Sequence, residues 1–353
     1  MRNFTFKGLL LTAVFMLLGC LSIQAANDDL ITKQITIKLD KAGTLPDRIA
    51  SSKKYKITNL KIVGEINGTD WNMIREMAGR NYQESSTEGN LSVLDLSEAK
   101  IVAGGDYYYD DNLFNNKVYT SNDEIGEYAF AYCSGLTSLT LPVGITSIGE
   151  FAFSGCSGLT SLTLPAGITS IGEYAFYGCS GLTSLTLPAG ITSIGISAFA
   201  YCSGLTSLNL PAGITSIDKY AFSGCSRLTS LTLPAGITSI GEFAFSYCSG
   251  LTSIYVYAEK VPRIGRYAFE GCASRKCTLY VPKGTYDNYR LSEFGYFENI
   301  VEFDATGIDK TTTSTDVEEV SRYSLNGQRL AVPVKGLNIV KYSDGTVRKV
   351  VVK

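Results

Sequence analysis

Cysteine is the residue type whose placement in this sequence most directly suggests chemistry. The chain of 353 residues carries nine cysteines and no histidine. Thiols can be nucleophiles, metal ligands or disulfide partners, but without histidine the chain has no Cys-His or Ser-His-Asp catalysis and no histidine-ligated metal site. Six cysteines recur every 23 residues and a seventh follows after 24: Cys133, Cys156, Cys179, Cys202, Cys225, Cys248 and Cys272. One thiol per repeat disfavours a tetrahedral zinc site, so we predict no bound metal.

Each of these cysteines follows a phenylalanine by three positions, on the side of the repeat expected to point inward. The pattern predicts buried, free thiols that pack as small apolar groups. Disulfides are the alternative, because stacked repeats would bring Cα atoms to about 5 Å, a distance that a disulfide accepts. Cys272 and Cys277 would then be the best-placed pair.

A polar and aromatic segment, DYYYDDN at residues 106–112, interrupts the repeats. Its carboxylates could hold Ca²⁺, but their spacing lacks the Asp-x-Asp-x-Asp-Gly order of an EF-hand loop. We expect an exposed insertion loop whose tyrosines form a contact patch, since tyrosine is amphipathic and loses little entropy on ordering. The candidate contact residues are Tyr107, Tyr108 and Tyr109.

Composition narrows the class of protein further. Apolar residues make up 45% and charged residues 18%, and the formal net charge of -2 offers no basic field for nucleic acid. Acid–base catalysis would need two carboxylates about 5–9 Å apart in a pocket, whereas the repeats offer scattered ones. We therefore predict no catalytic residues, no cofactor and no nucleic-acid partner.

A repeat dominates the middle of the chain. Its unit, read from Ile148, is IGEFAFSGCSGLTSLTLPAGITS, and it recurs in full from Ile125, Ile171, Ile194, Ile217 and Ile240 and in degenerate form from Ile264. Self-similarity at a period of about 20–30 residues indicates a solenoid. A unit of this length cannot bury its own apolar face, so each must stack on its neighbours.

The apolar positions predict the course of each unit. The first four, at i, i+4, i+5 and i+8 from Ile148, lie on one face of a short helical or 3₁₀ stretch. Leu162 and Leu164 then alternate with polar residues, as in a strand with one buried face. Pro165 ends the strand because it has no N–H for the ladder. Stacked units would place these strands about 4.8 Å apart in a parallel sheet.

The strand half and the turn half of the unit together resemble the BspA-like leucine-rich repeats of bacterial surface proteins, over roughly residues 91–282. The motifs that carry the resemblance are Leu159-x-x-Leu162-x-Leu164-Pro165 and Ile171-Gly172-x-x-Ala175-Phe176-x-x-Cys179. The resemblance implies an α/β-type repeat solenoid of 23-residue units. The parallel sheet would line the concave side, and short helical or 3₁₀ segments would lie outside.

The ends of the solenoid need caps, because an open terminal strand would seed association. We expect residues 26–90 to form an N-terminal cap and a first irregular repeat, with a strand at 60–64 and a helix at 70–78. Residues 91–303 would then be the solenoid with its C-terminal cap.

The concave sheet would carry two uncharged columns of outward side chains. Hydroxyls donate and accept hydrogen bonds, which suits protein backbone or sugars better than phosphate. Leucine-rich repeats generally bind ligands on this surface, so the resemblance implies a ligand site here, although a merely soluble face is the alternative. The columns comprise Ser138, Thr140, Ser161, Thr163, Ser184, Thr186, Ser207, Asn209, Ser230 and Thr232, with Ser253 and Tyr255 at the end.

The N-terminus is typical of an export signal. Arg2 and Lys7 precede an apolar core at residues 8–18 that is too short to span a bilayer. Cleavage before Ala26 would make residues 1–25 a signal peptide. Alternatively, Leu-Leu-Gly-Cys ending at Cys20 resembles a lipobox, which would make this cysteine an acylated anchor.

The C-terminus is expected to form a separate unit. Residues 304–316 are a polar, threonine-rich linker, and residues 317–353 carry strand and turn signals around Asn326-Gly327. In order and spacing, this tail resembles the C-terminal sorting domain of type IX secretion, and a plain small β unit is the alternative.

These features predict a non-enzymatic protein that is exported. It would either stay at the cell surface, in association with the outer membrane, or be secreted. Relatives of the BspA type are implicated in adhesion to matrix proteins, coaggregation and contact with host cells. The resemblance thus implies a protein or glycan partner on host or neighbouring bacterial cells. A glycan-binding accessory protein and a structural spacer are the alternatives. We expect a monomer that contacts the membrane only through an anchor or the export machinery.

Overall fold

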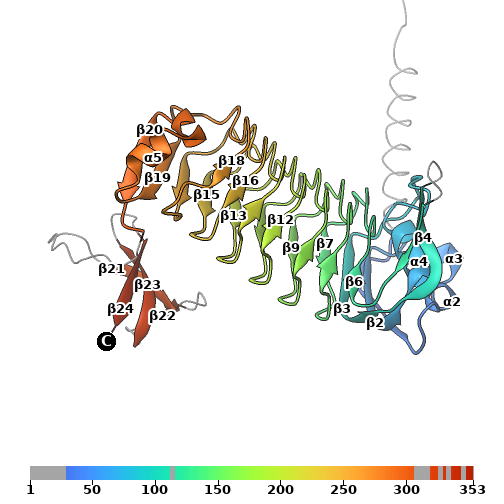
Figure 1. Cartoon of the computed structure of the whole chain (residues 1–353). Helices are drawn as coiled ribbons and strands as arrows, with labels where there is room; N and C mark the ends of the chain where they lie inside the picture. The colour runs from blue at the N-terminus through green and yellow to red at the C-terminus, as the bar shows by residue number, and fades with distance from the viewer. Residues whose placement is uncertain are drawn as a thin grey trace, which may run out of the picture.

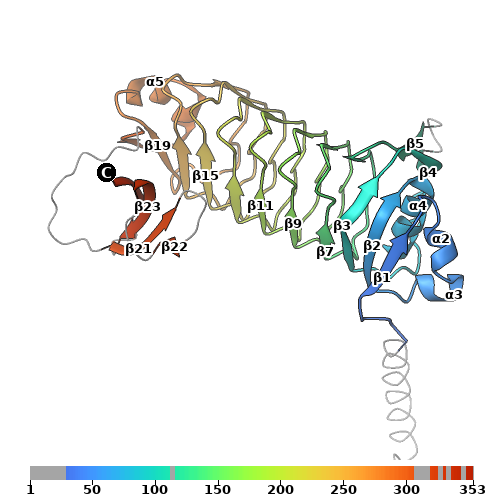
Figure 2. The ribbon, with the colours of Figure 1, turned by 90° about the horizontal axis from the view of Figure 1, so that it is seen from below.

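The computed structural model describes residues 29–111, 116–305, 319–324, 329–330, 335–342 and 347–352. The repeats coil into a solenoid whose strands lie side by side in one parallel sheet of 11 strands (Figures 1 and 2). The predicted leucine-rich-repeat solenoid is therefore confirmed. In spatial order, the strands are β1 (Ile35–Leu39), β2 (Asn59–Ile66), β3 (Val93–Ile101), β7 (Ser138–Thr140), β9 (Ser161–Thr163), β11 (Ser184–Thr186), β13 (Ser207–Asn209), β15 (Ser230–Leu233), β17 (Ser253–Val256), β19 (Thr278–Pro282) and β20 (Asn299–Phe303).

Successive coils place identical positions next to each other, which builds the core. Leu139 pairs with Leu162, and Leu185 with Leu208, each across one 23-residue step. One phenylalanine per coil, from Phe130 to Phe269, forms a buried ladder of parallel rings with centroids 5.0 to 5.6 Å apart. Because each ring is covered by its neighbours, a coil alone would expose most of its apolar surface.

The cysteine column lies inside this core. The eight described cysteines are free and buried, as the sequence predicts, and Cys272 and Cys277 form no disulfide. Each column thiol from Cys156 onward also donates a hydrogen bond to a phenylalanine carbonyl of the preceding coil, for example Cys156 Sγ to Phe130 O at 3.0 Å and Cys179 Sγ to Phe153 O at 3.1 Å. The thiols therefore link coils as well as filling space.

The segments opposite the long sheet are consecutive turns, where the sequence suggested short helical or 3₁₀ stretches. Two residues in each turn adopt left-handed backbone, as Tyr128 (φ 55°) and Tyr132 (φ 58°) do in the first coil. Left-handed residues interrupt a helix, so alternate N–H groups bond to the next coil instead. Tyr128 N donates to Glu150 O at 2.9 Å and Phe130 N to Ala152 O at 2.7 Å.

Rings on the outer side of these turns form a second ladder. Tyr109, Tyr128, Phe151 and Tyr174 stack in sequence, and a second stack runs from Tyr220 through Phe243 to Tyr267. Ser197 occupies the position between the two stacks. Short two-residue strands at the start of the turns form two further parallel sheets: β6 (Glu124–Ile125), β8 (Ser147–Ile148) and β10 (Ser170–Ile171); and β12 (Ser193–Ile194), β14 (Ser216–Ile217), β16 (Ser239–Ile240) and β18 (Arg263–Ile264).

A helix caps the N-terminal end of the solenoid. The predicted helix is confirmed as α4 (Gly68–Met77), which begins with a capping box between Asn67 and Asp70. The buried carboxylate of Asp70 also accepts hydrogen bonds from Gly43 N and Leu45 N. It thereby ties the helix to the start of α2 (Leu45–Arg48).

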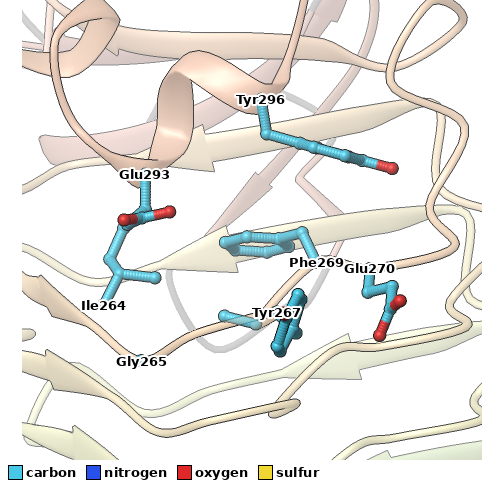
Figure 3. A pocket seen from close by; sticks show the side chains of 8 residues that line it. Ile264, Gly265, Tyr267, Phe269, Glu270, Glu293 and Tyr296 are labelled. Atoms are coloured by element: carbon cyan, nitrogen blue, oxygen red, sulfur yellow. The ribbon is translucent and has the colours of Figure 1, made fainter.

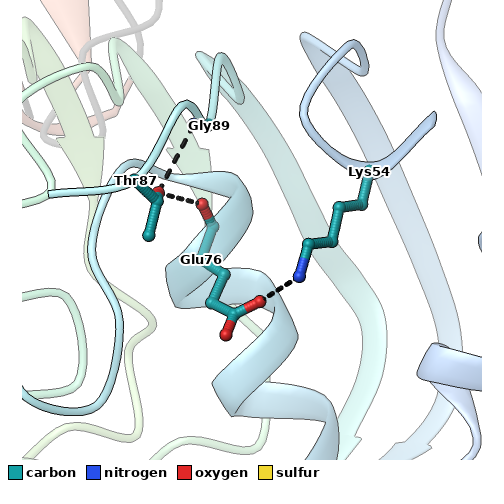
Figure 4. Close-up of polar contacts among 4 residues, drawn as sticks. All are labelled: Lys54, Glu76, Thr87 and Gly89. Atoms are coloured by element: carbon teal, nitrogen blue, oxygen red, sulfur yellow. Dashed lines mark hydrogen bonds and ion pairs between the residues drawn. The ribbon is translucent and has the colours of Figure 1, made fainter. Parts of the chain in front are cut away.

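Further contacts hold α3 (Ser51–Lys54) and the loop before β3 against α4 (Figure 4). Lys54 forms an ion pair with Glu76, and Thr87 Oγ1 donates to Glu76 O at 2.6 Å. Glu76 therefore joins the segment before the helix to the segment after it.

Side chains of the cap replace the hydrogen bonds of a missing coil. In later coils, two turn carbonyls accept hydrogen bonds from N–H groups of the preceding coil, as Glu150 O and Ala152 O do in the second coil. In the first coil, Tyr108 Oη donates to Glu127 O at 2.8 Å and Trp71 Nε1 to Ala129 O at 2.9 Å. These carbonyls would otherwise be left unpaired inside the protein.

The prediction of an exposed loop at residues 106–112 is wrong for most of that segment. The segment continues β4 (Gly104–Asp111), which pairs antiparallel with β5 (Asn116–Thr120), while Asn112 lies outside the described residues. Tyr108 is 1% exposed and Tyr109 7% exposed, so neither can contact a ligand. Their role is structural: Tyr108 caps the first coil and Tyr109 stacks on Tyr128 at 4.0 Å.

Two short helices close the other end of the solenoid, α5 (Tyr286–Arg290) and the 3₁₀ helix η1 (Glu293–Tyr296). Phe294 packs on Phe269, the last ring of the buried ladder, at 5.4 Å. Tyr289 Oη donates to Ala258 O at 2.6 Å and so fastens α5 to the last coils.

The tail forms its own antiparallel sheet, as the strand and turn signals suggest. Its strands are β21 (Glu319–Ser324), β22 (Arg329–Leu330), β23 (Gly336–Tyr342) and β24 (Val347–Val352), in the order β22-β21-β23-β24. The turn at Asn326-Gly327, residues 306–316 of the expected linker, and the expected signal peptide with Cys20 all lie outside the described residues. Within the described part, no helix has the length and apolarity needed to cross a membrane.

We predict that the thiols of the column resist alkylation in the folded protein. Burial raises the pKa of Cys202 to about 12 and also raises that of Cys133, so almost no thiolate is present near neutrality. Iodoacetamide at about pH 8 should leave the column unmodified and label it after unfolding in guanidinium. Peptide mapping by mass spectrometry checks this, and rapid labelling of native Cys202 would contradict it.

A second prediction concerns the cap. Tyr108→Phe removes the hydroxyl that pairs with Glu127 O and should lower the free energy of unfolding by about 1 kcal/mol. Denaturant unfolding measures the difference. Tyr247→Phe is the matched control, because Tyr247 is 59% exposed and should leave stability unchanged. Equal stability of the two variants would refute the capping role.

Candidate functional site

The outward side chains of the long sheet form two continuous columns. Strand register aligns Val93 with Ser138 and Asp95 with Thr140, and the same alignment recurs along the sheet. The predicted ligand residues on the strands are therefore brought together on one surface. We call the outward residues of β7, β9, β11, β13 and β15 the hydroxyl face: Ser138, Thr140, Ser161, Thr163, Ser184, Thr186, Ser207, Asn209, Ser230 and Thr232.

The polar groups of the hydroxyl face are open to solvent and largely uncommitted. All its residues are exposed except the half-buried Ser138. Within the described chain, the side chains of its Thr140 column, Asn209 included, form no hydrogen bond to protein, and in the serine column only Ser230 does so, accepting from Ser253 at 3.1 Å. Groups that already donate and accept to water can exchange those bonds for bonds to a partner.

Two other threonine columns, which the sequence analysis did not single out, behave differently. Thr160 Oγ1 donates to Thr137 O at 3.3 Å, and Thr183 Oγ1 donates to Thr160 O at the same distance. A similar column contains Thr215 and Thr238. These hydroxyls bind neighbouring coils, so position within the unit decides which threonines remain free.

A shallow pocket interrupts the hydroxyl face between β9 and β11. These strands pair only at Ser161 and Ser184, whereas β7 and β9 pair over three residues. The pocket has a volume of about 490 Å³ and is lined by Thr163, Thr186 and Pro188 as well as the two serines. Its lining thus includes four of the predicted ligand residues.

The N-terminal end of the same surface is charged. Lys61 on β2 lies 2.7 Å from Glu98 and 3.3 Å from Asp95, both on β3. The hydrogen bonds that its ammonium group donates to Glu98 and Asp95 raise the pKa of Lys61. Burial opposes ionisation of Asp95, but hydrogen bonds from Ser97 and Lys61 outweigh it and lower its pKa. The cluster sets one ammonium group against two carboxylates, so it keeps a net negative charge.

The C-terminal end is aromatic. Tyr255, the predicted end of the Thr140 column, stacks on Tyr280 at 4.3 Å. Phe303 meets Tyr255 and Tyr257 edge-on, at 6.0 and 5.1 Å. Sequence reasoning found Tyr255 but missed the other three rings, because they lie on β19, on β20 and just after β17, outside the regular unit.

Of the three tyrosines predicted as a contact patch, only Tyr107 stays partly accessible. It is half-buried, packs against Tyr82 and Tyr119, and lies under the ammonium group of Lys117. It is on the capping hairpin rather than on the hydroxyl face.

The described residues show little that could perform catalysis. They contain no group of three acidic or thiol side chains placed to hold a metal ion. Glu270 and Glu293 share a pocket, but one is half-buried and the other exposed, so they are not the buried pair that acid–base catalysis would need.

Comparison with known proteins identifies the repeats. The BspA type leucine rich repeat region matches residues 103–229 and 215–328, which together span well over half of the 353 residues. No curated protein matches the chain.

Solved structures of bacterial leucine-rich repeat proteins are also similar. One from T. pallidum is 27% identical, with a TM-score of 0.40, over 48% of this chain and 76% of that one. A leucine rich cell surface protein from Faecalibacterium prausnitzii is 32% identical, with a TM-score of 0.35, over 41% of this chain and 45% of that one. One from Bacteroides ovatus is 26% identical, with a TM-score of 0.33, over 52% and 59%. The chain thus spans less than two thirds of the last two.

The charged end of the sheet gives a testable prediction. Lys61→Met removes one of the hydrogen bonds that lower the pKa of Asp95, so that pKa should rise towards its ordinary value. The bonds from Ser97 persist, so the rise should be partial. Carboxyl carbon shifts followed by NMR through a pH titration measure it. An unchanged Asp95 titration would show that the ion pair does not form in solution.

Proposed function

Because the chain belongs to the BspA-type leucine-rich repeat family, we propose that it is a non-enzymatic, exported cell-surface protein that binds a macromolecular partner through its hydroxyl face. Bacterial proteins of this family are surface proteins, and leucine-rich repeats generally serve in protein interaction. Adhesion to host matrix or to neighbouring bacterial cells is the form of binding that we propose.

The observation that carries this proposal is the uncommitted state of the hydroxyl face. Five adjacent strands present uncharged side chains in register, and the threonine hydroxyls make no bond within the described protein. An extended protein segment offers N–H and C=O groups that such hydroxyls can pair with, without desolvating any charge. The pocket between β9 and β11 would give the partner an anchoring point.

A glycan partner is the second candidate, favoured by the aromatic end of the same surface. Stacked rings such as Tyr255 and Tyr280 offer flat apolar faces next to the hydroxyl columns. Sugar rings present both hydroxyls and apolar C–H faces, so this combination suits them. A spacer without any specific ligand is the remaining possibility, and the experiment below addresses it.

We further propose that residues 1–25 direct export, with cleavage before Ala26 or acylation of Cys20, and that the tail from residue 317 is a sorting unit for type IX secretion. A monomer attached to the outer membrane or released from the cell agrees with this proposal. Mass spectrometry of the mature N-terminus distinguishes a free Ala26 from a lipidated Cys20.

The binding proposal predicts the effect of charge on the hydroxyl face. Thr163→Glu combined with Thr186→Glu would place two carboxylates beside the pocket, where a neutral partner would have to desolvate them. Binding to immobilised matrix proteins of the fibronectin class, measured by surface plasmon resonance, should weaken about tenfold or more. A polysaccharide array, probed with the unmodified chain and with this double variant, tests the glycan candidate.

Ser157→Glu combined with Ser180→Glu is the matched control. These serines are exposed in the turns of the same two coils, so the variant adds equal charge away from the hydroxyl face. Equal binding by both double variants would remove the hydroxyl face as the site. Binding of neither matrix proteins nor glycans by the unmodified chain would favour the spacer.

A further inference from the structure

The outer turns of the solenoid end in an open backbone edge. In most internal coils, main-chain groups of each turn pair with the next coil. Among them, Ile240 O accepts from Gly265 N at 2.7 Å, and Phe243 N and Phe245 N donate to Arg266 O and Ala268 O at 3.1 and 2.8 Å. The equivalent groups of the last coil are Ile264 O, Tyr267 N and Phe269 N, and no described residue supplies a partner for any of them.

These three unpaired groups border one pocket. It has a volume of about 350 Å³ and lies between the last coil and η1, which takes the place of a further coil (Figure 3). Tyr267 and Phe269 form its floor, Tyr296 lies above them, and Glu270 and Glu293 flank it on opposite sides. Tyr296 Oη donates to Cys272 O at 2.9 Å, which fixes that ring at the rim.

The pocket also leaves one face of the outer ring ladder uncovered. Phe243 stacks on one side of Tyr267 at 5.2 Å, and no described ring stacks on its other side. Tyr267 is 59% exposed. The buried ladder differs, because Phe294 and Phe297 of the cap already cover Phe269. An occupant can therefore continue the outer ladder but not the inner one.

We propose that this pocket binds a short peptide segment of a partner protein, which adds to the open edge in the turn conformation that the next coil would have. One N–H of the segment donates to Ile264 O, and two of its carbonyls accept from Tyr267 N and Phe269 N. Addition of a strand to an exposed edge is a common mode of peptide recognition, in which main-chain bonds give affinity and side-chain pockets give selectivity.

The internal coils indicate which side chains fit. The coil residue that matches the first residue of the bound peptide is glycine in most coils. A Cβ at this residue would lie 2.3 Å from Glu242 N at Gly265 and 2.6 Å from Glu127 N at Gly149. The third position is aromatic in most coils and would stack on Tyr267, and the fourth is alanine. The second residue of the peptide would lie beside the positive charge of Arg266, whereas the negative charges of Glu270 and Glu293 line the pocket. A neutral residue at this position is therefore repelled by neither charge.

The test uses the full chain and the probe acetyl-Gly-Gln-Tyr-Ala-amide. Peptide titration followed by amide NMR should shift the Tyr267 and Phe269 proton resonances downfield in a saturable manner, as new hydrogen bonds form. Replacing the glycine by N-methylglycine puts a methyl group in place of the N–H that donates to Ile264 O and should weaken binding at least about fivefold. Tyr267→Ala should weaken it about tenfold.

Tyr220→Ala is the matched control, since Tyr220 belongs to the same column but its N–H already donates to Glu242 O at 3.0 Å. It should leave peptide binding unchanged, as should the Thr163→Glu, Thr186→Glu variant, so this site and the hydroxyl face can fail separately. Unshifted Tyr267 and Phe269 resonances, or equal binding of the N-methylated peptide, would overturn the proposal. Shifts of the same amides on concentrating the free protein would make a second copy the occupant and would overturn it too.

Discussion

Hydrogen bonds along the solenoid axis are the interaction on which the rest of this structure depends. The strands and the left-handed turns of a coil both direct their N–H and C=O groups at neighbouring coils, so no coil can satisfy its own backbone. The ends must therefore be terminated. Trp71 and Tyr108 do this at the N-terminal end with side-chain donors, whereas α5 and η1 complete the apolar core but leave the turn edge open.

The same axial stacking produces the candidate binding surface without any dedicated active-site loop. Because the coils repeat in register, one Ser-Leu-Thr motif becomes two columns of side chains. The irregular coils at each end modify those columns, with the Lys61, Asp95 and Glu98 cluster on one side and the Tyr255, Tyr280 and Phe303 rings on the other. A partner that runs along the sheet would thus meet charged, neutral and aromatic zones in turn.

Most features that repeat in the sequence could be predicted, whereas several contacts that occur only once could not. The period of 23 placed the strands, the inward phenylalanines and the buried thiols correctly, because the same pattern recurs in each unit. The turns were misassigned as helical because their apolar spacing fits a helix, while the left-handed residues that prevent one leave no hydropathy signal. Tyr108 and Tyr109 were misplaced for a different reason: their partners, Glu127 and Tyr128, are contacts of the first coil that only the three-dimensional cap creates.

Near-identical coils in strict register also carry an evolutionary consequence. Most internal junctions join the same core residues, such as Leu139 to Leu162 and Phe176 to Phe199, so loss or gain of one whole unit by unequal recombination would recreate a junction close to one that already exists. Neither end would need to change. Lineages could therefore lengthen or shorten the reach of the molecule in steps of one coil, while its two termini keep the same chemistry.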